Sequence, residues 1–184
     1  KEKEANENYV IGGEESFGLM IGNEIRDKDA VSAVALLCEM AAYEKAKGKS
    51  LFDKMIELYM QYGFYYERLI SITKKGMNGQ KEIAAMMEGF RTSPPQAIDG
   101  SAVVEMLDYD MQTGKNLLSG ETWNLQLPKS NVLQFITADG SKISARPSGT
   151  EPKIKFYFSV HTTLASKDAY DATFASLDQK IQRI

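Results

Sequence analysis

The sequence is nearly without cysteine and histidine. It holds one residue of each type among 184, Cys38 and His161. A single cysteine excludes an internal disulfide framework and fits a reducing compartment. Cys38 ends the apolar run Ala35-Leu36-Leu37-Cys38, so we interpret it as a buried packing residue and not as a nucleophile. His161 has no visible partner in the sequence, and we expect it to have a structural or solvated role.

Excess charge of one sign and long apolar runs are also missing. The 22 Lys and Arg against 25 Asp and Glu give a net charge of −3, which excludes the broad basic field of a general nucleic-acid binder. The longest nearly apolar run, residues 30–38, is far shorter than the ~20 residues that span a bilayer. The charged start Lys1-Glu2-Lys3-Glu4 has no signal-peptide pattern. We therefore expect a cytoplasmic protein that binds neither nucleic acid nor a membrane.

The first third of the chain predicts one strand and two helices. A β-prone run at residues 9–11 stops at Gly12-Gly13. Asp29 can cap a helix that Gly48 ends, and Ser50 opens a second helix that Gly63 ends. Both helices carry wide apolar faces that one strand cannot cover. These faces imply a sheet that this sequence does not contain, so the segment reads as an incomplete α/β domain.

The pattern after Gly63 predicts an antiparallel sheet with helices. We expect strands at residues 64–74, 102–109, 132–138, 142–146 and 153–161. Asp139-Gly140 is a hairpin signal between two of these strands. Helices are expected at 78–91, with Ile83, Met86, Met87 and Phe90 inward, and from about residue 166. The predicted fold class is α+β, with domains at residues 1–63 and 64–184.

The loop at residues 12–18 reads Gly-Gly-Glu-Glu-Ser-Phe-Gly. Glu14 can accept hydrogen bonds from two neighbouring hydroxyls, and Ser16 can both donate and accept. This pair suits the vicinal diol of a sugar. The alternative is an ordinary solvated turn or helix start.

The loop at residues 146–152 reads Arg-Pro-Ser-Gly-Thr-Glu-Pro and lies in a basic stretch. Residues 142–155 hold one anion, Glu151, and four cations: Lys142, Arg146, Lys153 and Lys155. Arg146 can bind a phosphate with two parallel hydrogen bonds, while Ser148, Thr150 and the backbone N–H groups around Gly149 supply neutral donors. The alternative is a hairpin loop with exposed basic residues. The pattern is not a Walker-type P-loop.

The two loops, in this order, resemble those of the α-D-phosphohexomutase superfamily. The segments Arg-Asp-Lys-Asp-Ala-Val at 26–31 and Tyr-Gly-Phe-Tyr-Tyr at 62–66 are similar to its phosphoglucomutase branch. The resemblance covers nearly the whole chain. It implies the end of the third domain and the complete fourth domain of a four-domain enzyme. Such an enzyme moves a phosphoryl group between the C1 and C6 oxygens of glucose through a bisphosphate intermediate.

The resemblance also implies roles for particular residues. Glu14 and Ser16 would hold sugar hydroxyls. The non-reacting phosphate would be held by Arg146, Ser148, Gly149 and Thr150, helped by Lys155 or Lys153. Lys28 falls where the family places a lysine near the reacting oxygen, a candidate for proton transfer. However, Asp27 and Asp29 would raise the pKa of a lysine, whereas base catalysis needs it lowered. The alternative for Lys28 is a solvated charge before a helix.

The family's catalytic serine segment and its magnesium loop do not occur in this sequence. We interpret the acidic pair in Asp108-Tyr109-Asp110 as a hairpin turn, so no metal ligand is predicted. The resemblance therefore implies that Mg²⁺, glucose 1,6-bisphosphate and the N-terminal domains of the same polypeptide belong to the full-length enzyme. This chain alone is not expected to catalyse phosphoryl transfer.

Three alternatives stay open besides a phosphoglucomutase acting on a glucose phosphate. Two are sister enzymes of the superfamily, a phosphomannomutase or a phosphopentomutase; the Glu-Glu-Ser-Phe-Gly loop favours glucose. The third is a non-catalytic module that binds sugar phosphates. The uncovered apolar helices before Gly63 argue against it, because an independent module would have covered them.

Overall fold

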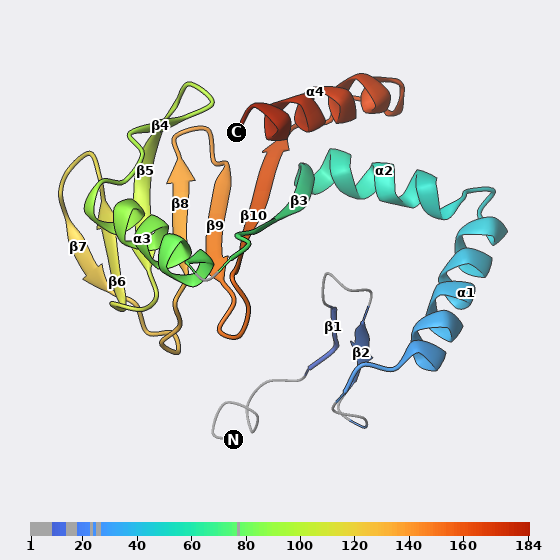
Figure 1. Cartoon of the computed structure of the whole chain (residues 1–184). Coiled ribbons are helices and arrows are strands. Elements are labelled where there is room, and N and C mark those ends of the chain that lie inside the picture. The colour runs from blue at the N-terminus through green and yellow to red at the C-terminus, as the bar shows by residue number, and fades with distance from the viewer. Residues whose placement is uncertain (1–8, 14–17, 23, 25–26, 77) are drawn as a thin grey trace. The chain divides into compact units, whose positions relative to one another are not determined.

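The structure is a computed structural model that describes residues 9–13, 18–22, 24, 27–76 and 78–184 (Figure 1). The chain divides into two compact units, residues 1–58 and 59–184. This division falls inside the second helix, and the domain boundary predicted at residue 63 stays a prediction. None of the described helices is long and apolar enough to cross a membrane.

The first unit holds a short hairpin, one complete helix and most of a second. Strands β1 (Ile11–Gly13) and β2 (Leu19–Ile21) pair antiparallel. β2 was not predicted, because three residues are too few to show an alternating pattern. Helix α1 (Ala30–Ala46) begins as predicted: the Asp29 carboxylate accepts the N–H groups of Val31 and Ser32 at 3.1 and 2.9 Å. Helix α2 (Leu51–Tyr62) follows it.

The apolar face of α1 is exposed in this unit. Exposed large side chains recur along the helix: Val31, Val34, Leu37, Met40 and Tyr43. Cys38 is exposed as well, so its interpretation as a buried residue is wrong. Cys38 is exposed because the one short hairpin of this unit cannot cover the apolar faces of both helices.

The second unit is built on an eight-stranded antiparallel sheet in the order β3-β10-β9-β8-β5-β6-β7, with β4 paired to β5. The strands are β3 (Phe64–Thr73), β4 (Ala97–Ile98), β5 (Ser101–Asp108), β6 (Thr113–Asn116), β7 (Thr122–Asn124), β8 (Leu133–Thr137), β9 (Lys142–Pro147) and β10 (Lys153–Thr162). The predicted α+β class is confirmed. The strands that the sequence missed are the short ones: β4, β6 and β7.

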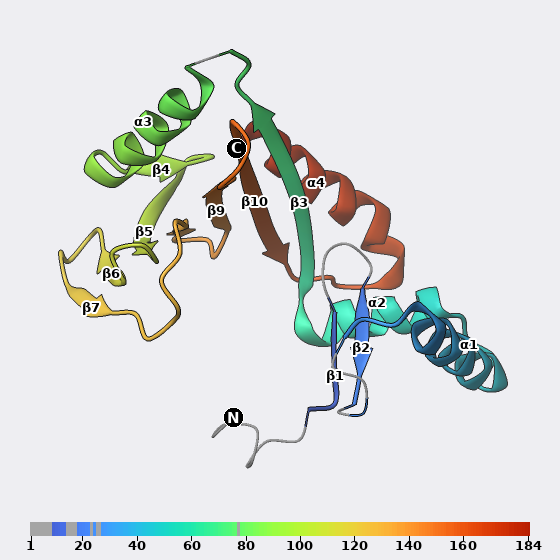
Figure 2. The ribbon, with the colours of Figure 1, turned by 60° about the horizontal axis from the view of Figure 1, so that its bottom comes forward.

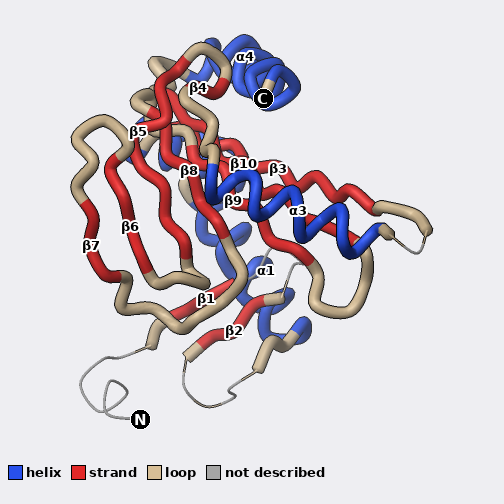
Figure 3. The backbone as a smooth tube through the Cα atoms, turned by 60° about the vertical axis from the view of Figure 1, so that its left-hand side comes forward, coloured by secondary structure: helices blue, strands red, loops and turns tan. Residues whose placement is uncertain are grey.

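Helices α3 (Gly79–Thr92) and α4 (Tyr170–Arg183) pack on one face of this sheet (Figures 2 and 3). As predicted, α3 turns Ile83 and Met87 into the core, with Met86 and Phe90 packed against it. The other core residues come from the strands: Val103, Leu133, Phe135, Ala145 and Ile154. α4 is held to β3 by Asp178, which accepts hydrogen bonds from Tyr66 and Arg68.

Two glycines allow the turns that connect these elements. Gly63 has φ of +99° between α2 and β3, and Gly140 has φ of +81° between β8 and β9. Residues other than glycine rarely adopt such positive φ angles. The predicted Asp139-Gly140 hairpin is therefore confirmed, and it brings β9 back alongside β8 toward the loop that follows Arg146.

Candidate functional site

Arg146 and Lys155 lie side by side at one end of the sheet. They are direct partners in the register of β9 and β10. Their chain neighbours Ala145 and Ile154 are buried under the helices, so alternation along each strand places Arg146 and Lys155 on the opposite face. Together with Pro147, Ser148 and Gly149 they line a pocket of about 170 Å³, which we call the front pocket.

The charge of the front pocket is positive and unbalanced. Like charges directly opposite each other in a sheet destabilise it unless an anion lies between them. Neither Arg146 nor Lys155 forms an ion pair with a residue in the described ranges. An anion with two negative charges could therefore bind both cations without first displacing a carboxylate of the described residues.

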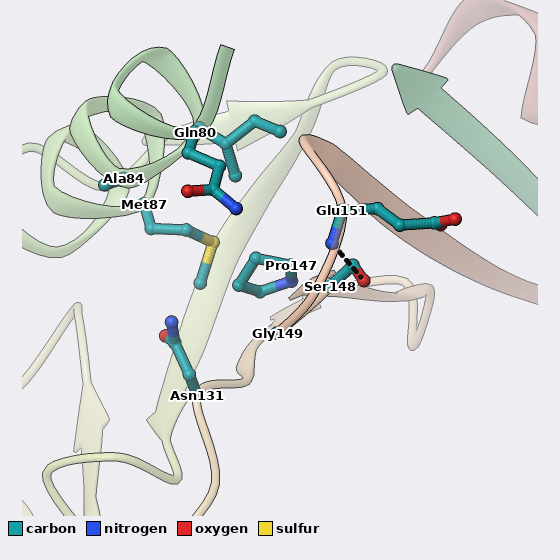
Figure 4. Close-up of a pocket in the computed structure, with 9 residues that line it drawn as sticks. Gln80, Ala84, Met87, Asn131, Pro147, Ser148, Gly149 and Glu151 are labelled. Atoms are coloured by element: carbon teal, nitrogen blue, oxygen red, sulfur yellow. Dashed lines mark hydrogen bonds between the residues drawn. The ribbon is translucent and has the colours of Figure 1, made fainter. Parts of the chain in front are cut away.

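The loop after β9 is folded back on the Ser148 side chain. Ser148 Oγ accepts the N–H group of Thr150 at 3.4 Å. It also accepts the N–H group of Glu151 at 3.3 Å, the bond drawn as a dashed line in Figure 4. The Ser148 N–H donates to the Lys153 carbonyl at 2.8 Å. Of the predicted phosphate ligands, Thr150 is not among the residues lining the front pocket. At Gly149 an added Cβ would meet no heavy atom within 4 Å, so the backbone there is open to a ligand.

A second pocket of about 260 Å³, the rear pocket, lies between α3 and the other side of the same loop. Figure 4 shows the side chains of Gln80, Met87 and Asn131 projecting toward Pro147. Its lining is Gln80, Ile83, Ala84, Met87, Asn131, Pro147, Ser148, Gly149 and Glu151. The sequence offered no signal for Asn131, one of two amides in the connection between β7 and β8, or for Gln80, an exposed residue in the first turn of α3.

Asn131, in the lining of the rear pocket, is held by Arg91, which also forms an ion pair with Asp108. Arg91 donates from Nε to Asp108 Oδ2 at 2.9 Å and from Nη2 to Asn131 Oδ1 at 2.7 Å. The other Asp108 oxygen accepts the N–H groups of Asp110 and Met111 at 3.0 and 3.1 Å. The hairpin turn predicted at this acidic segment is thus confirmed, and its first carboxylate is fully engaged.

The remaining predicted residues belong to the first unit. Glu14 and Ser16 lie outside the described residues, in the connection between β1 and β2. Lys28 lies just before α1, its side chain 50% exposed and its Nζ 3.4 Å from Asp27 Oδ1. Hydrogen bonds from the backbone and side chain of Lys28 lower the pKa of Asp27. Within the described ranges, no three His, Cys, Asp or Glu side chains gather where they could hold a metal ion.

Residues 1–62 match the family described as phosphoglucomutase/phosphomannomutase, α/β/α domain III. The chain is also similar to the phosphoglucomutases of Staphylococcus aureus strains USA300, COL and MRSA252, each 39% identical over 155 residues. These alignments cover 84% of this chain but 28% of each relative, so the chain spans less than a third of the relatives' length. The chain belongs to the phosphoglucomutase/phosphomannomutase family, of which it carries the end of domain III and the domain that follows.

Proposed function

We propose that the loop at residues 146–150, with Lys155, binds the phosphate of a sugar phosphate. The observation that carries this proposal is the pairing of Arg146 and Lys155 across β9 and β10, at a pocket that Ser148 and Gly149 also line. A phosphate monoester carries about −1.5 to −2 charges at neutral pH. It would balance both cations, while the guanidinium can donate two parallel hydrogen bonds to its oxygens.

The wider activity that we propose follows from the relatives, which are phosphoglucomutases. The chain would supply substrate binding to an enzyme that interconverts glucose 1-phosphate and glucose 6-phosphate through glucose 1,6-bisphosphate. Glu14 and Ser16 would hold sugar hydroxyls. The described residues do not fit a magnesium site, since Asp108, in the acidic segment, is engaged by Arg91 and by backbone N–H groups. Any Mg²⁺ of the full-length enzyme would therefore be bound elsewhere, and we expect no mutase turnover from this chain alone.

Lys28 is proposed as a proton-transfer group of the full-length enzyme. Its side chain is half exposed. The neighbouring residue Asp29 caps α1, and its carboxylate already accepts hydrogen bonds from two backbone N–H groups. In the full-length protein, Lys28→Met should lower kcat with little change in KM, because a proton-transfer group acts in the transition state. An unchanged kcat would mean that Lys28 is a solvated surface charge with no part in proton transfer.

The phosphate-loop assignment is tested by titrating inorganic phosphate into the ¹⁵N-labelled 184-residue chain. Shifts should cluster at residues 146–150. A hydrogen bond to a charged group contributes roughly 1.5–3 kcal/mol, so Arg146→Ala should weaken binding by roughly ten- to a hundredfold. Arg146→Lys should recover part of this loss, because an ammonium cannot make the two parallel bonds.

Lys115→Ala serves as the matched control. It removes one positive charge from β6, on the far side of the sheet order from β9 and β10, and should leave the affinity for phosphate nearly unchanged. Equal losses in the Arg146 and Lys115 variants would mean that only the overall charge attracts phosphate. That result, or shifts away from residues 146–150, would overturn the assignment.

A further inference from the structure

The phosphate loop cannot offer all its backbone donors in the conformation described here. Ser148 Oγ accepts the N–H groups of Thr150 and Glu151. A carboxylate or phosphate oxygen competes well for such groups, because hydrogen bonds to charged acceptors are the stronger ones. Both bonds are also long, at 3.4 and 3.3 Å, so exchanging Ser148 for a ligand is favourable once phosphate arrives. A change in the backbone conformation of the loop would turn these two N–H groups away from Ser148 Oγ.

The rear pocket provides the space for this change. It is a hollow of about 260 Å³ bordered by Pro147, Ser148 and Gly149 on one side and by α3 on the other. One water molecule takes only ~30 Å³ of liquid volume, so a loop segment can enter. Gly149 has no heavy atom within 4 Å of an ideal Cβ position. The far wall is apolar at Ile83 and Met87, both of which are already buried in the core.

One polar group in this pocket has a defined orientation. Arginine has donors and no acceptor, so the Asn131 oxygen must face Arg91, as the 2.7 Å bond from Nη2 shows. The Asn131 NH₂ group then faces away from Arg91. Arg91 itself is fixed by Asp108, whose side chain is 7% exposed. The backbone around Asn131 is held by bonds between Tyr109 and residues 130 and 132.

We propose that Asn131 is a positioning residue for the phosphate loop: its NH₂ group, aimed by Arg91, donates to the loop backbone when the loop moves into the rear pocket to bind phosphate. The proposal rests on the phosphate-loop assignment above. The donor meets a carbonyl of the Pro147–Gly149 segment, and the movement releases the N–H groups of Thr150 and Glu151 to the ligand. Asn131 thus acts through the loop and does not touch the phosphate.

The direct test follows the Asn131 side-chain NH₂ resonance while inorganic phosphate is titrated into the ¹⁵N-labelled 184-residue chain. The resonance is identified by its absence in Asn131→Asp. We expect it to shift with the same Kd as the Gly149 amide. An Asn131 resonance that stays fixed while Gly149 saturates would overturn the proposal. A fixed Gly149 amide, or an unaffected Arg146→Ala variant, would instead overturn the phosphate-loop assignment.

Two variants separate positioning from a structural role. Asn131→Asp keeps an oxygen for Arg91 and loses the NH₂ donor, whereas Asn131→Leu loses both. If the NH₂ group positions the loop, both should weaken phosphate binding by about three- to tenfold, the equivalent of one hydrogen bond. A merely structural role predicts wild-type phosphate binding in Asn131→Asp. Weakening in Asn131→Asp alone would reflect its added charge. Either of these results overturns the proposal.

The control is Asn124→Leu on β7, an exposed asparagine that lines neither pocket. It should bind phosphate as the wild type does. Thermal unfolding of each variant gives a temperature at which every chain is folded, and phosphate is titrated at that temperature so that lost binding is not confused with lost structure.

Discussion

Arg91 and Asp108 form a largely buried ion pair, with Nε 2.9 Å from Oδ2 and side chains 18% and 7% exposed. It joins α3 to the end of β5, and Arg91 also donates a hydrogen bond to Asn131 in the lining of the rear pocket. Removing one partner of such a pair leaves a buried charge without its counter-ion. Arg91→Ala should therefore lower the free energy of unfolding by about 3–5 kcal/mol, measured by urea denaturation.

The matched control for this prediction is Arg68→Ala. Arg68 pairs with Asp178 at 3.1 Å, but its side chain is 44% exposed, and exposed pairs contribute only about 0–1 kcal/mol. Asp108→Asn should cost less than Arg91→Ala, because the amide oxygen can still accept the N–H groups of the turn. Equal losses in the free energy of unfolding for Arg91→Ala and Arg68→Ala would show that the burial of the Arg91–Asp108 pair does not increase its contribution.

Two glycines should respond oppositely to alanine. At Gly140, φ is +81° and an added Cβ would lie 2.4 Å from His161 Cε1, so Gly140→Ala should destabilise the chain by about 1–2 kcal/mol or more. At Gly149 a Cβ meets nothing within 4 Å, so Gly149→Ala should keep or slightly raise stability. Its new methyl group should nevertheless weaken phosphate binding, because it occupies the space where a ligand approaches the backbone. Thermal unfolding and phosphate titration measure the two effects separately; a Gly149→Ala chain that binds phosphate normally would argue against that approach.

Asp139 should make the second unit sensitive to acid. Partial burial raises its pKa, but hydrogen bonds from Lys180, Thr137 and Ser141 outweigh that effect and hold the pKa well below its usual value. A carboxyl with a lowered pKa in the folded state stabilises the fold above its unfolded pKa of about 3.9 and loses that contribution as the pH falls below it. The stability difference between wild type and Asp139→Asn should therefore shrink from pH 7 to pH 3.

Glu88→Gln provides the comparison for the acid experiment, since it removes an exposed carboxylate from α3. Its effect on the free energy of unfolding should be small at both pH values. A difference for Asp139→Asn that stays constant over this range would show that the hydrogen bonds to Asp139 do not depend on its charge.

Cys38 should react with a thiol reagent in the folded 184-residue chain, because it is exposed on α1 among exposed apolar side chains. The measurement is the rate of labelling by a chromogenic disulfide, compared with the rate in urea. Similar rates are expected. Strong protection without urea would mean that the apolar face of α1 is covered in solution, for instance by a second copy of the chain.

Local signals in the sequence determined most of the secondary structure. Asp29 caps α1 because its carboxylate reaches N–H groups two and three residues ahead, and such contacts need no distant partner. The alternation of Ile154, Phe156, Phe158 and Val160 marked β10 and its buried face. The cations and hydroxyls of residues 146–155 likewise indicated an anion site. By contrast, β2, β4, β6 and β7 are too short for any periodicity to appear.

Only the tertiary structure decided which distant groups meet. The register of β9 and β10 places Arg146 against Lys155, and a shift of one residue would have put them on opposite faces. Asn131 lines the rear pocket beside the loop, and its amide oxygen accepts a hydrogen bond from Arg91, 40 residues earlier in the chain. The exposure of Cys38 also depended on what packs over α1, which no local pattern records. Local hydrogen bonds and side-chain alternation depend on neighbours in the chain, whereas pockets and buried ion pairs depend on which elements pack together.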